Sequence, residues 1–564
     1  MADSREGEIK RPEKALKAKK TTTPDSTEHH NRKDKVVTDT GLEISRLYTA
    51  ADCPQGEAAL AEIGSPGQFP FTRGSAANMY TDEPWIMRSY SGFGEASACN
   101  NRYRQLVRQG TDEIVMAVDL PTQVGYDSDH LMARGEVGKV GVAIDTLRDM
   151  EILFDGIPLN SLKRVSMLGN SFSPTALSLF IALGEKQGLT PDDFVVDLQN
   201  DILKEYVARG TYIYPIRPSI RITTDTIEYC ALNAKHWYPC TICTNHINAA
   251  GAGSSYAMAF ALCNGLVYMR HLMEKGHAID DIAPLFSMFM DERSDFFVTI
   301  ALLRAARKIW ARVLKEMLGA RSSESLALKI TAYSHGGETL LEPVNNIVRI
   351  TLASLAYVLG GVHSLYNASY DEVLGTPTEE ASKIALRTQQ ILAYELGITN
   401  TADPLGGSYF IENLTRRIEE DIYTELTKVE NMGGAIEAIE SGYYQRKITE
   451  GALKRQKAVE NKERIIVGVN KFRTESQAPS GAFRIDPALE DAQLKRLQKV
   501  KQERNNEVVK ETLSYVREIA EGEKNLVPAV LEAVRAYATI GEISDVLRGV
   551  FGEYQAKEFF SANR

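Results

Sequence analysis

The sequence has few of the features that mark secreted, membrane-spanning or nucleic-acid-binding proteins. Only six cysteines occur in 564 residues, at uneven spacing, which argues against a disulfide framework. No run approaches the roughly 18 consecutive apolar residues of a transmembrane helix. The 65 basic residues are outnumbered by 75 acidic ones, and a formal charge of −10 argues against sequence-independent binding of nucleic acid. We therefore expect a cytoplasmic chain without a membrane or nucleic-acid partner.

The first 84 residues lack the periodic apolar pattern of helices and strands. Residues 1–40 are polar and rich in lysine and threonine, which indicates a disordered tail. This tail has no apolar core of a signal peptide, and its acidic residues disfavour an organelle transit peptide. Residues 41–84 contain Pro54, Pro66 and Pro70 with few periodic runs. They predict an extended arm that lies on another part of the chain.

Short apolar or β-rich runs alternate with helical segments over residues 85–410. The eight runs are Trp85–Tyr90, Ile114–Asp119, Arg164–Leu168, Phe194–Leu198, Cys240–Asn245, Leu285–Met290, Leu326–Ala332 and Val362–Tyr366. Eight strands alternating with helices predict an α/β protein with a (β/α)₈ TIM barrel. A doubly wound open sheet is the alternative, and the even spacing favours closure. Residues 411–564 are charged and amphipathic, which predicts a helical C-terminal region.

Polar residues occur at or just after the end of every predicted strand. In a barrel of this type the carboxyl ends of the strands carry the active site. We therefore expect a substrate site there, with an uncharged or weakly charged mouth. The residues are Tyr90, Asp119, Asn170, Gln199, Asn245, His246, Asp291, Glu292, Ser334, His335 and Asn367.

Motifs of the common enzyme classes are absent. The sequence has no P-loop, no G-x-S-x-G, no G-x-G-x-x-G after a strand and no H-E-x-x-H. Strand alternation points Cys240 and Cys243 to opposite faces, so we expect neither joint metal ligation nor a disulfide. Asp127 and Asp129 are interpreted as turn caps. These patterns alone predict a barrel enzyme without a metal site and leave its reaction open.

Nine stretches between about residues 45 and 554 carry a resemblance to a known family. They are FPFTRG (69–74), GYDSDH (125–130), GVAIDT (141–146), LFDGIPL (153–159), LQNDILKEY (198–206), TYIYP (211–215), ALRTQQILAYE (385–395), DPLGGSY (403–409) and VGVNKF (467–472). In these stretches the sequence resembles the cobalamin-dependent acyl-CoA mutases, the methylmalonyl-CoA mutase family. The resemblance implies that coenzyme A threads the barrel axis and that adenosylcobalamin covers the strand carboxyl ends. The implied reaction is a radical rearrangement in which the thioester carbonyl migrates to the neighbouring carbon.

The same resemblance implies roles for four residues. His246 matches the histidine that hydrogen-bonds the migrating carbonyl, Gln199 the glutamine beside the acyl group, and Tyr90 the tyrosine by the reacting carbon. Arg209 matches the arginine that binds the free carboxylate of methylmalonyl and succinyl groups, where members with uncharged acyl groups carry glutamine. An arginine buried without an anionic partner costs several kcal/mol, so Arg209 implies a substrate carboxylate.

Further contacts are implied for residues around the barrel. Substrate contacts are expected at Thr72, Arg73, Tyr80, Ser166 and Ser287. Cofactor contacts are expected at Asp119, Glu372 and Gly92, and at Asn367 if it replaces the family's asparagine near the ribose. Ala76 and Asn245 stand where the family usually has tyrosine, so we expect them to enlarge the acyl pocket.

The resemblance also implies a partner. The family's cobalamin domain carries D-x-H-x-x-G, and none of the nine histidines here lies in that pattern, nor is a cobalamin-binding Rossmann-like domain evident. We expect a separate small subunit to carry it in a heterodimer or heterotetramer; a chaperone GTPase stays open as a further partner. A carboxylated acyl-CoA is the favoured substrate. The alternatives are a bulkier alkyl- or aryl-substituted succinyl- or malonyl-CoA, an uncharged isobutyryl- or 2-hydroxyisobutyryl-type group, and a catalytically silent relative that binds CoA thioesters.

Overall fold

A computed structural model describes most of the chain from residue 63 onward. The described residues are 36–37, 41–45, 47–52, 56, 63–292, 295–335, 339–375, 377–474, 486 and 488–556. The predicted disordered tail lies outside the described residues, apart from Val36–Val37, which form strand β1 and pair with β2 (Glu43–Ile44).

Eight parallel strands form a closed barrel, which confirms the prediction. They are β3 (Ile86–Ser91), β4 (Glu113–Met116), β5 (Arg164–Leu168), β6 (Val196–Gln199), β7 (Cys240–Cys243), β8 (Phe286–Met290), β9 (Ile330–Ser334) and β10 (Ser364–Asn367). They lie in the order β6-β5-β4-β3-β10-β9-β8-β7. Tyr238 closes the ring, because its backbone N–H donates to Val196 O and its carbonyl accepts from Leu198 N, each at 2.8 Å. The two edges meet there, which excludes the open sheet.

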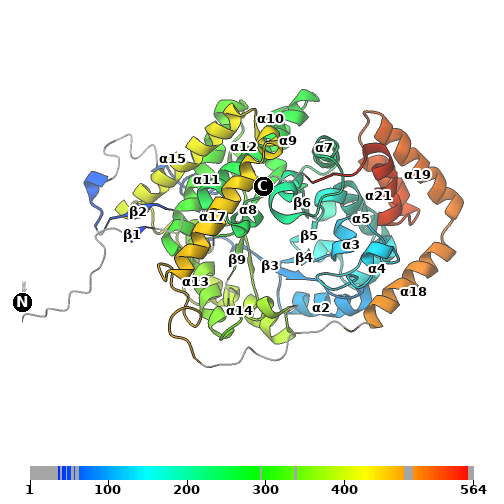
Figure 1. Ribbon diagram of the computed structural model, residues 1–564, viewed down its shortest axis with the longest axis horizontal. Helices are drawn as coiled ribbons and strands as arrows, with labels where there is room; N and C mark the ends of the chain where they lie inside the picture. Colours follow the sequence, from blue (N-terminus) through cyan, green and yellow to red (C-terminus); the bar gives the residue numbers. More distant parts are fainter. Residues whose placement is uncertain are drawn as a thin grey trace, which may run out of the picture.

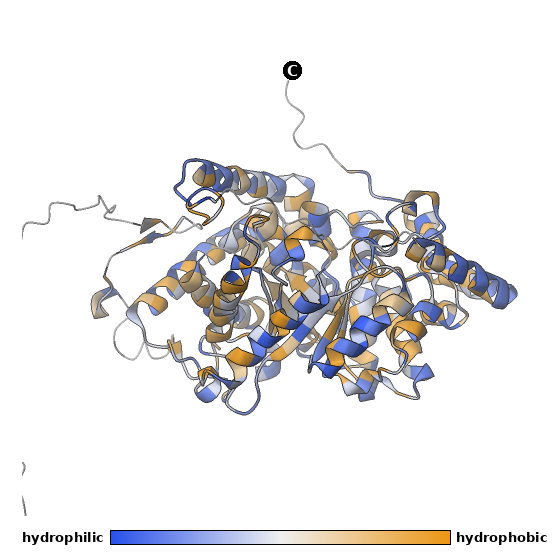
Figure 2. Ribbon diagram, turned by 90° about the horizontal axis from the view of Figure 1, so that it is seen from below, coloured by the Kyte–Doolittle hydropathy of each residue, from blue (hydrophilic) through white to orange (hydrophobic). Residues whose placement is uncertain are grey.

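Helices cover the outside of the barrel and, as Figure 2 shows, most carry both hydrophilic and hydrophobic residues. No helix among the described residues is long and apolar enough to cross a membrane. The α-helices up to residue 394 are α2 (Ala96–Arg108), α3 (Leu120–Gln123), α4 (Leu147–Leu153), α5 (Ser173–Lys186), α6 (Ile202–Lys204), α7 (Ile216–Asn233), α8 (Asn245–Ala250), α9 (Ser254–Glu274), α10 (Ile279–Ile282), α11 (Phe296–Met317), α12 (Ser323–Leu326), α13 (Asn345–Gly360) and α14 (Glu379–Tyr394). The short turns are η1 (Ala50–Asp52), η2 (Leu131–Ala133), η3 (Leu159–Ser161), η4 (Asn170–Phe172), η5 (Pro191–Asp193), η6 (Glu205–Arg209), η7 (Ala283–Leu285), η8 (Glu372–Leu374) and η9 (Ile398–Asn400).

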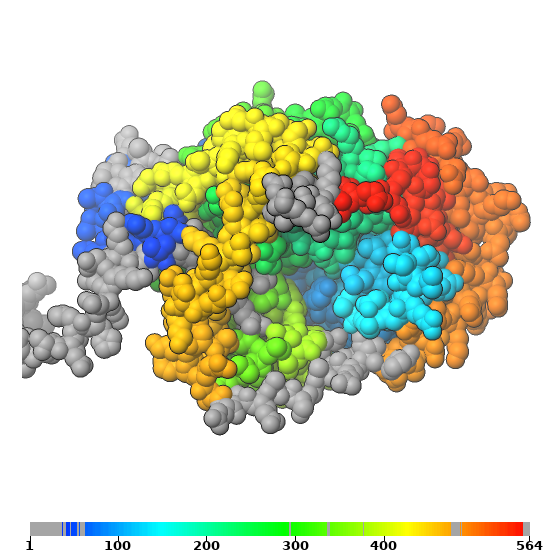
Figure 3. All heavy atoms as spheres, viewed as in Figure 1, coloured from blue at the N-terminus to red at the C-terminus, as the bar shows by residue number. Residues whose placement is uncertain are grey.

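The C-terminal region is helical and divides into two groups on different sides of the barrel (Figure 1, Figure 3). The first group packs on α9 and α11, where buried Arg304 of α11 pairs with Glu412 and buried Lys308 pairs with Glu419 at 2.7 Å. The second group packs on α5 through α20. The first comprises α15 (Tyr409–Asn431), α16 (Ala435–Glu440) and α17 (Tyr443–Glu460); the second comprises α18 (Ala488–Glu503), α19 (Asn506–Glu521), α20 (Val527–Arg535) and α21 (Ile540–Phe551).

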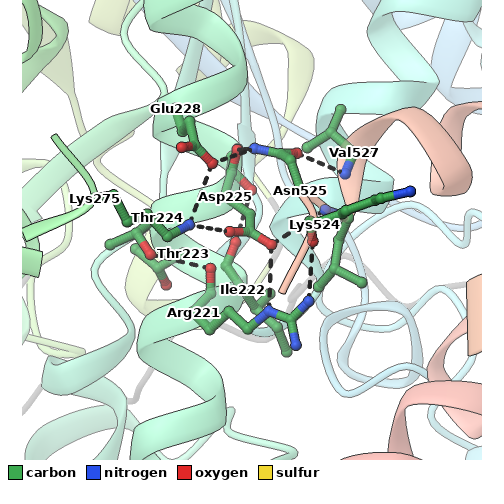
Figure 4. Close-up of polar contacts among 12 residues, drawn as sticks. Arg221, Ile222, Thr223, Thr224, Asp225, Glu228, Lys275, Lys524, Asn525 and Val527 are labelled. Atoms are coloured by element: carbon green, nitrogen blue, oxygen red, sulfur yellow. Dashed lines mark hydrogen bonds and ion pairs between the residues drawn. The ribbon is translucent and has the colours of Figure 1, made fainter. Parts of the chain in front are cut away.

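A buried carboxylate ties the second group to the barrel (Figure 4). Asp225 of α7 accepts a hydrogen bond from Lys275 Nζ at 2.7 Å and another from the backbone N–H of Leu526 at 3.1 Å. The side-chain amide of Asn525 donates to the Asp225 carbonyl at 2.8 Å, and Arg221 donates to the Lys524 carbonyl at 3.0 Å. The turn between α19 and α20 is therefore anchored at several points.

The described parts of the arm lie on the barrel and on α15. The backbone carbonyls of Phe71 and Thr72 each accept a hydrogen bond of 3.0 Å from the buried guanidinium of Arg307. Further out, the amide of Asn413 on α15 donates to Asp52 O at 2.6 Å. These contacts fix the arm at points that precede β3 in the chain.

Candidate active site

The carboxyl ends of the strands surround a cavity of about 170 Å³. Every barrel strand contributes to its wall, as do η6, α8 and η8. It brings together the three residues for which a catalytic role was expected, and four further expected site residues. The lining residues are Arg88, Tyr90, Val115, Ser166, Met167, Leu168, Asp197, Gln199, Arg209, Thr241, Asn245, His246, Phe289, Tyr333, Tyr366 and Glu372.

Arg209 lies at the end of the widened helical turn η6. The turn is of the π type, with the N–H of Gly210 bonded to Glu205 O at 2.9 Å, and such turns are frequent at functional sites. One terminal nitrogen of Arg209 donates to Glu205 at 3.3 Å and to Thr211 Oγ1 at 3.2 Å, and the other donates to Gln123. Three partners therefore fix the guanidinium against the cavity.

The charge around Arg209 is not balanced by its own partner. The sequence suggested an arginine without an anionic partner, and the structure corrects this, because Arg209 pairs with Glu205. Glu205 is also paired with the buried Lys204, however, so two cations share one carboxylate. Burial raises the pKa of Glu205, but the Lys204 and Arg209 charges outweigh it and hold that pKa below its usual value. The three side chains together carry one net positive charge beside the cavity.

Lys204 also orients Gln199. Its ammonium group donates to Gln199 Oε1 at 3.0 Å. Because a lysine can only donate, the amide oxygen must face Lys204 and the NH₂ group must face away from it. Gln199 lines the cavity, so it presents a hydrogen-bond donor to a bound molecule.

Asn245 and His246 are the first residues of α8, directly after β7 and Thr244. Both line the cavity. Asn245 is 6% exposed, and its Oδ1 atom has no hydrogen-bond partner within the described part of the chain. His246 is half-buried and lies on the same side of the cavity as Gln199. Polar groups that can contact a carbonyl therefore concentrate beside β6 and β7.

Four aromatic rings, here called the aromatic wall, lie on four consecutive strands of the sheet. Tyr90 on β3 and Tyr366 on β10 have ring centroids 5.7 Å apart. Tyr366 and Tyr333 on β9 are stacked, 5.0 Å apart and 10° from parallel, and Phe289 on β8 follows at 6.4 Å. Burial raises the pKa of Tyr90, so its hydroxyl stays protonated near neutral pH.

The carboxylate of Glu372 fixes two rings of the aromatic wall. Tyr333 donates to Glu372 Oε1 and Tyr366 donates to Glu372 Oε2, each at 2.7 Å. The Ser369 N–H adds a third bond at 3.1 Å. Burial raises the pKa of Glu372 above its usual value, because the opposing effect of these hydrogen-bond donors is smaller. No role was expected for Tyr333 and Phe289, although each is the fourth residue of its strand and lies on the inward face.

The floor of the cavity is charged, which corrects the expectation of a weakly charged mouth. Arg88 pairs with Glu113 at 2.9 Å, and Arg164 pairs with Asp197 at 3.0 Å; all four side chains are at most 9% exposed. Four charged side chains line the cavity itself: the cations Arg88 and Arg209 and the carboxylates Asp197 and Glu372. Charged residues in strands usually indicate a surface, but here alternation turns them toward the axis.

Two of the expected substrate contacts form part of the hydroxyl lining of the axis. Ser166 donates to Glu113 and accepts from Arg88 at 3.3 Å. Ser287 is buried and bonded at 2.7 Å to Thr241 Oγ1, and Thr241 lines the cavity. Small hydroxyl side chains leave room along the axis and offer hydrogen bonds to a polar chain.

The remaining expected substrate residues lie at the opposite end of the barrel. Tyr80 donates to Val362 O at 2.5 Å, just before β10 begins, and Arg73 donates to Asp403 at 3.0 Å. Thr72 is buried in the same segment. Ala76 is exposed there and does not line the cavity, so the expectation that it enlarges the acyl pocket is wrong. Of the two residues expected to enlarge the acyl pocket, Asn245 alone lines the cavity.

Several expected cofactor residues have structural partners. Asp119 caps α3 by accepting from Thr122 N at 3.0 Å, and it also accepts from Gly138 N at 2.8 Å. Burial raises its pKa to about 6. Asn367 follows Tyr366 on the strand and so points outward, where it accepts from Ser354 at 2.8 Å. It therefore cannot replace a ribose contact.

Three other interpretations can be compared with the structure. A Cβ atom at Gly92 would lie 1.9 Å from Ala117 O, so glycine is required there by backbone packing. Asp127 is not a turn cap: it accepts from Gly541 N at 2.7 Å and, with Asp129, pairs with Lys501 of α18. The thiols Cys240 and Cys243 are buried, and each donates to a backbone carbonyl, Cys240 to Asn200 O at 3.2 Å and Cys243 to Thr241 O at 3.4 Å.

Comparison with known proteins assigns the fold and this cavity to one family. The model of the family described as methylmalonyl-CoA mutase matches residues 37–553. The chain belongs to the methylmalonyl-CoA mutase family. It is thus one of the cobalamin-dependent acyl-CoA mutases, which are isomerases.

Individual relatives of this mutase match over nearly its whole length. It is 42% identical to the methylmalonyl-CoA mutase of Rhizobium meliloti over 92% of this chain and 72% of the relative. It is 40% identical to the 2-hydroxyisobutanoyl-CoA mutase large subunit of Aquincola tertiaricarbonis over 94% of each chain. The methylmalonyl-CoA mutase of Escherichia coli is 39% identical over 91% of this chain and 72% of its own.

Two features fit the adenosylcobalamin that this family uses. The connection after β4 exposes Leu131, Met132 and Val140 by 81%, 70% and 54%. Such exposed apolar side chains suit a large flat group or a second polypeptide. Glu372 Oε2 accepts both the Tyr366 hydroxyl and the Ser369 N–H, whereas Oε1 accepts one tyrosine hydroxyl and has a further acceptor site that suits a ribose hydroxyl.

Proposed function

We propose that this chain is the large, substrate-binding subunit of an adenosylcobalamin-dependent mutase that rearranges a carboxylated acyl-CoA of the methylmalonyl or succinyl type. The observation that carries the proposal is the guanidinium of Arg209, which lines the cavity and shares its carboxylate partner Glu205 with the buried Lys204. Arg209 can therefore pair with a substrate carboxylate as well, and charge-assisted bonds to a guanidinium are the strong ones.

The residues of this chain then hold and shield the acyl group. Arg209 binds its free carboxylate, while His246 and the NH₂ group of Gln199 donate to the thioester carbonyl. The protonated hydroxyl of Tyr90 packs beside the reacting carbon. When bound, adenosylcobalamin would supply the radical that removes a substrate hydrogen, and by covering the cavity it would keep water from the reacting carbon.

A separate small subunit is the proposed source of the lower cobalt ligand. The match to a protein named as a large subunit, over 94% of both chains, supports this arrangement. The D-x-H-x-x-G motif would reside on that small subunit, and the pair would form a heterodimer or heterotetramer. The exposed apolar residues after β4 are suited to face it.

The substrate charge is tested with Arg209→Gln in the purified pair with adenosylcobalamin. Turnover of methylmalonyl-CoA and isobutyryl-CoA is measured for wild type, Arg209→Gln and the control Arg217→Gln, an exposed arginine on α7. A lost hydrogen bond to a charged group costs about 1.5–3 kcal/mol, so kcat/KM for methylmalonyl-CoA should fall about 10- to 100-fold in Arg209→Gln only. Equal losses on both substrates would refute the carboxylate assignment.

A further inference from the structure

The active-site cavity has two chemically different halves. The polar groups Gln199, Arg209, Asn245 and His246 come from β6, η6 and α8. The aromatic wall comes from β3, β10, β9 and β8, which are consecutive in the sheet. A carboxylate and a thioester use only the polar half, and the opposite half offers ring surface.

Three rings of the aromatic wall, those of Tyr333, Tyr366 and Phe289, offer ring surface and no free hydroxyl group. Tyr333 and Tyr366 use their hydroxyls on the two oxygens of Glu372. Phe289 has no polar atom, and the guanidinium of Arg88 lies 5.9 Å from its ring centroid. The three rings therefore form a rigid apolar surface whose positions are set before anything binds.

This surface is larger than a methyl group requires. Each aromatic side chain can bury about 150–250 Å² of surface. The whole cavity, which must also hold the carboxylate and the thioester, has a volume of about 170 Å³, and an apolar cavity of roughly 150 Å³ holds benzene. Asn245 has a small side chain at the cavity's polar edge and does not fill it.

We propose that the natural acyl group carries, besides its carboxylate, a hydrophobic substituent larger than methyl that packs on the aromatic wall. This inference rests on the proposed function and narrows its substrate class to alkyl- or aryl-substituted succinyl- or malonyl-CoA. The carboxylate lies at Arg209, the thioester carbonyl at His246 and Gln199, and the substituent lies across the cavity from them.

Direct binding tests this without requiring turnover. Titration calorimetry with the purified chain measures Kd for succinyl-CoA, butylsuccinyl-CoA and benzylsuccinyl-CoA, which separates alkyl from aryl substituents. Burial of one CH₂ group contributes about 0.8 kcal/mol, or roughly fourfold in affinity. We expect at least one substituted thioester to bind about tenfold or more tightly than succinyl-CoA.

Two variants of one residue separate the ring from its hydroxyl. Tyr366→Phe keeps the ring and removes the bond to Glu372, so it should retain the preference for the substituted thioester. Tyr366→Ala and Phe289→Ala remove a ring each and should reduce that preference to less than about threefold. Phe297→Ala, at an exposed position on α11, is the control and should change nothing.

The outcomes are distinguishable from failure of the proposed function. Equal Kd values for all three thioesters in wild type, with loss of affinity in Arg209→Gln, would overturn the inference and leave the carboxylate assignment standing. Isobutyryl-CoA is titrated in the same way, and a Kd equal to that of succinyl-CoA would instead overturn the proposed function. If Tyr366→Ala kept the substrate preference but raised the adenosylcobalamin concentration needed for half-maximal activity, the wall would serve the cofactor and the inference would fall.

Discussion

At the scale of residues, one buried side chain orients two others that line the cavity. Lys204 is fully buried, yet it contacts no substrate in the proposed complex; it turns the Gln199 amide and shares Glu205 with Arg209. Two side chains that are proposed to bind substrate therefore depend on one that is not. His246 is different, because it reaches the cavity from the start of α8 and acts through its own ring.

His246→Ala should lower turnover severely and leave the fold intact. The imidazole would donate to the migrating carbonyl, and loss of such a donor typically costs about 10²–10³ in kcat. Steady-state kinetics with the purified pair measures this, and thermal unfolding checks the fold. His271→Ala on α9, outside the cavity, is the matched control. A variant that kept more than about a third of the activity would contradict the role.

At the scale of elements, the arm is fixed to the start of β10 by a neutral histidine. His363 Nδ1 accepts from the Ile330 N–H at 2.9 Å, so its Nε2 carries the proton and donates to Ser75 Oγ at 2.6 Å. Burial, together with the nearby positive charges of Arg307 and Lys329, lowers the pKa of His363 to about 3. The arm therefore depends on this ring remaining uncharged.

Acid should weaken the fold through His363. The unfolded side chain has a pKa near 6.5, so between about pH 6.5 and 3 the unfolded state binds a proton that the folded state does not. The stability from the neutral ring is complete above pH 6.5 and is lost as pH falls, by at most about 5 kcal/mol. Denaturant unfolding of wild type and His363→Gln from pH 7.5 to 5 measures this. Parallel curves for the two proteins would show that His363 is not responsible.

Helix α18 is joined to the barrel through two buried carboxylates. Gln493 donates to Asp145 Oδ2 at 2.7 Å and to Asp149 Oδ1 at 3.1 Å. Gln493→Leu would leave both acceptors without that donor, and an unsatisfied buried polar group costs about 1–3 kcal/mol. The free energy of unfolding should fall by that amount. Gln498→Leu, exposed on the same helix, should be neutral; an equal effect would mean that helix propensity is being measured.

At the scale of the whole molecule, the sequence predicted the eight barrel strands better than the charged residues buried inside the barrel. All eight strands were located because apolar runs and polar strand ends recur at a regular distance. Glu113 and Asp197 were missed as axis residues, because their charge suggests solvent and only the pairing with Arg88 and Arg164 permits burial. Asn367 was misplaced by one position, which on a strand reverses the face.

The chain's place in a larger assembly gives the last prediction. In the proposed complex the lower cobalt ligand comes from a D-x-H-x-x-G motif, and this sequence has none. We therefore expect the isolated chain to bind adenosylcobalamin weakly and to turn over no acyl-CoA. Gel filtration with a tenfold excess of the cofactor, followed by visible absorption spectra, should show none bound to the chain alone. A cobalamin-binding chain with the motif from the same organism should restore both co-elution and turnover. Co-elution of cobalamin with the isolated chain would contradict a shared site, because one polypeptide would then hold both faces of the cofactor.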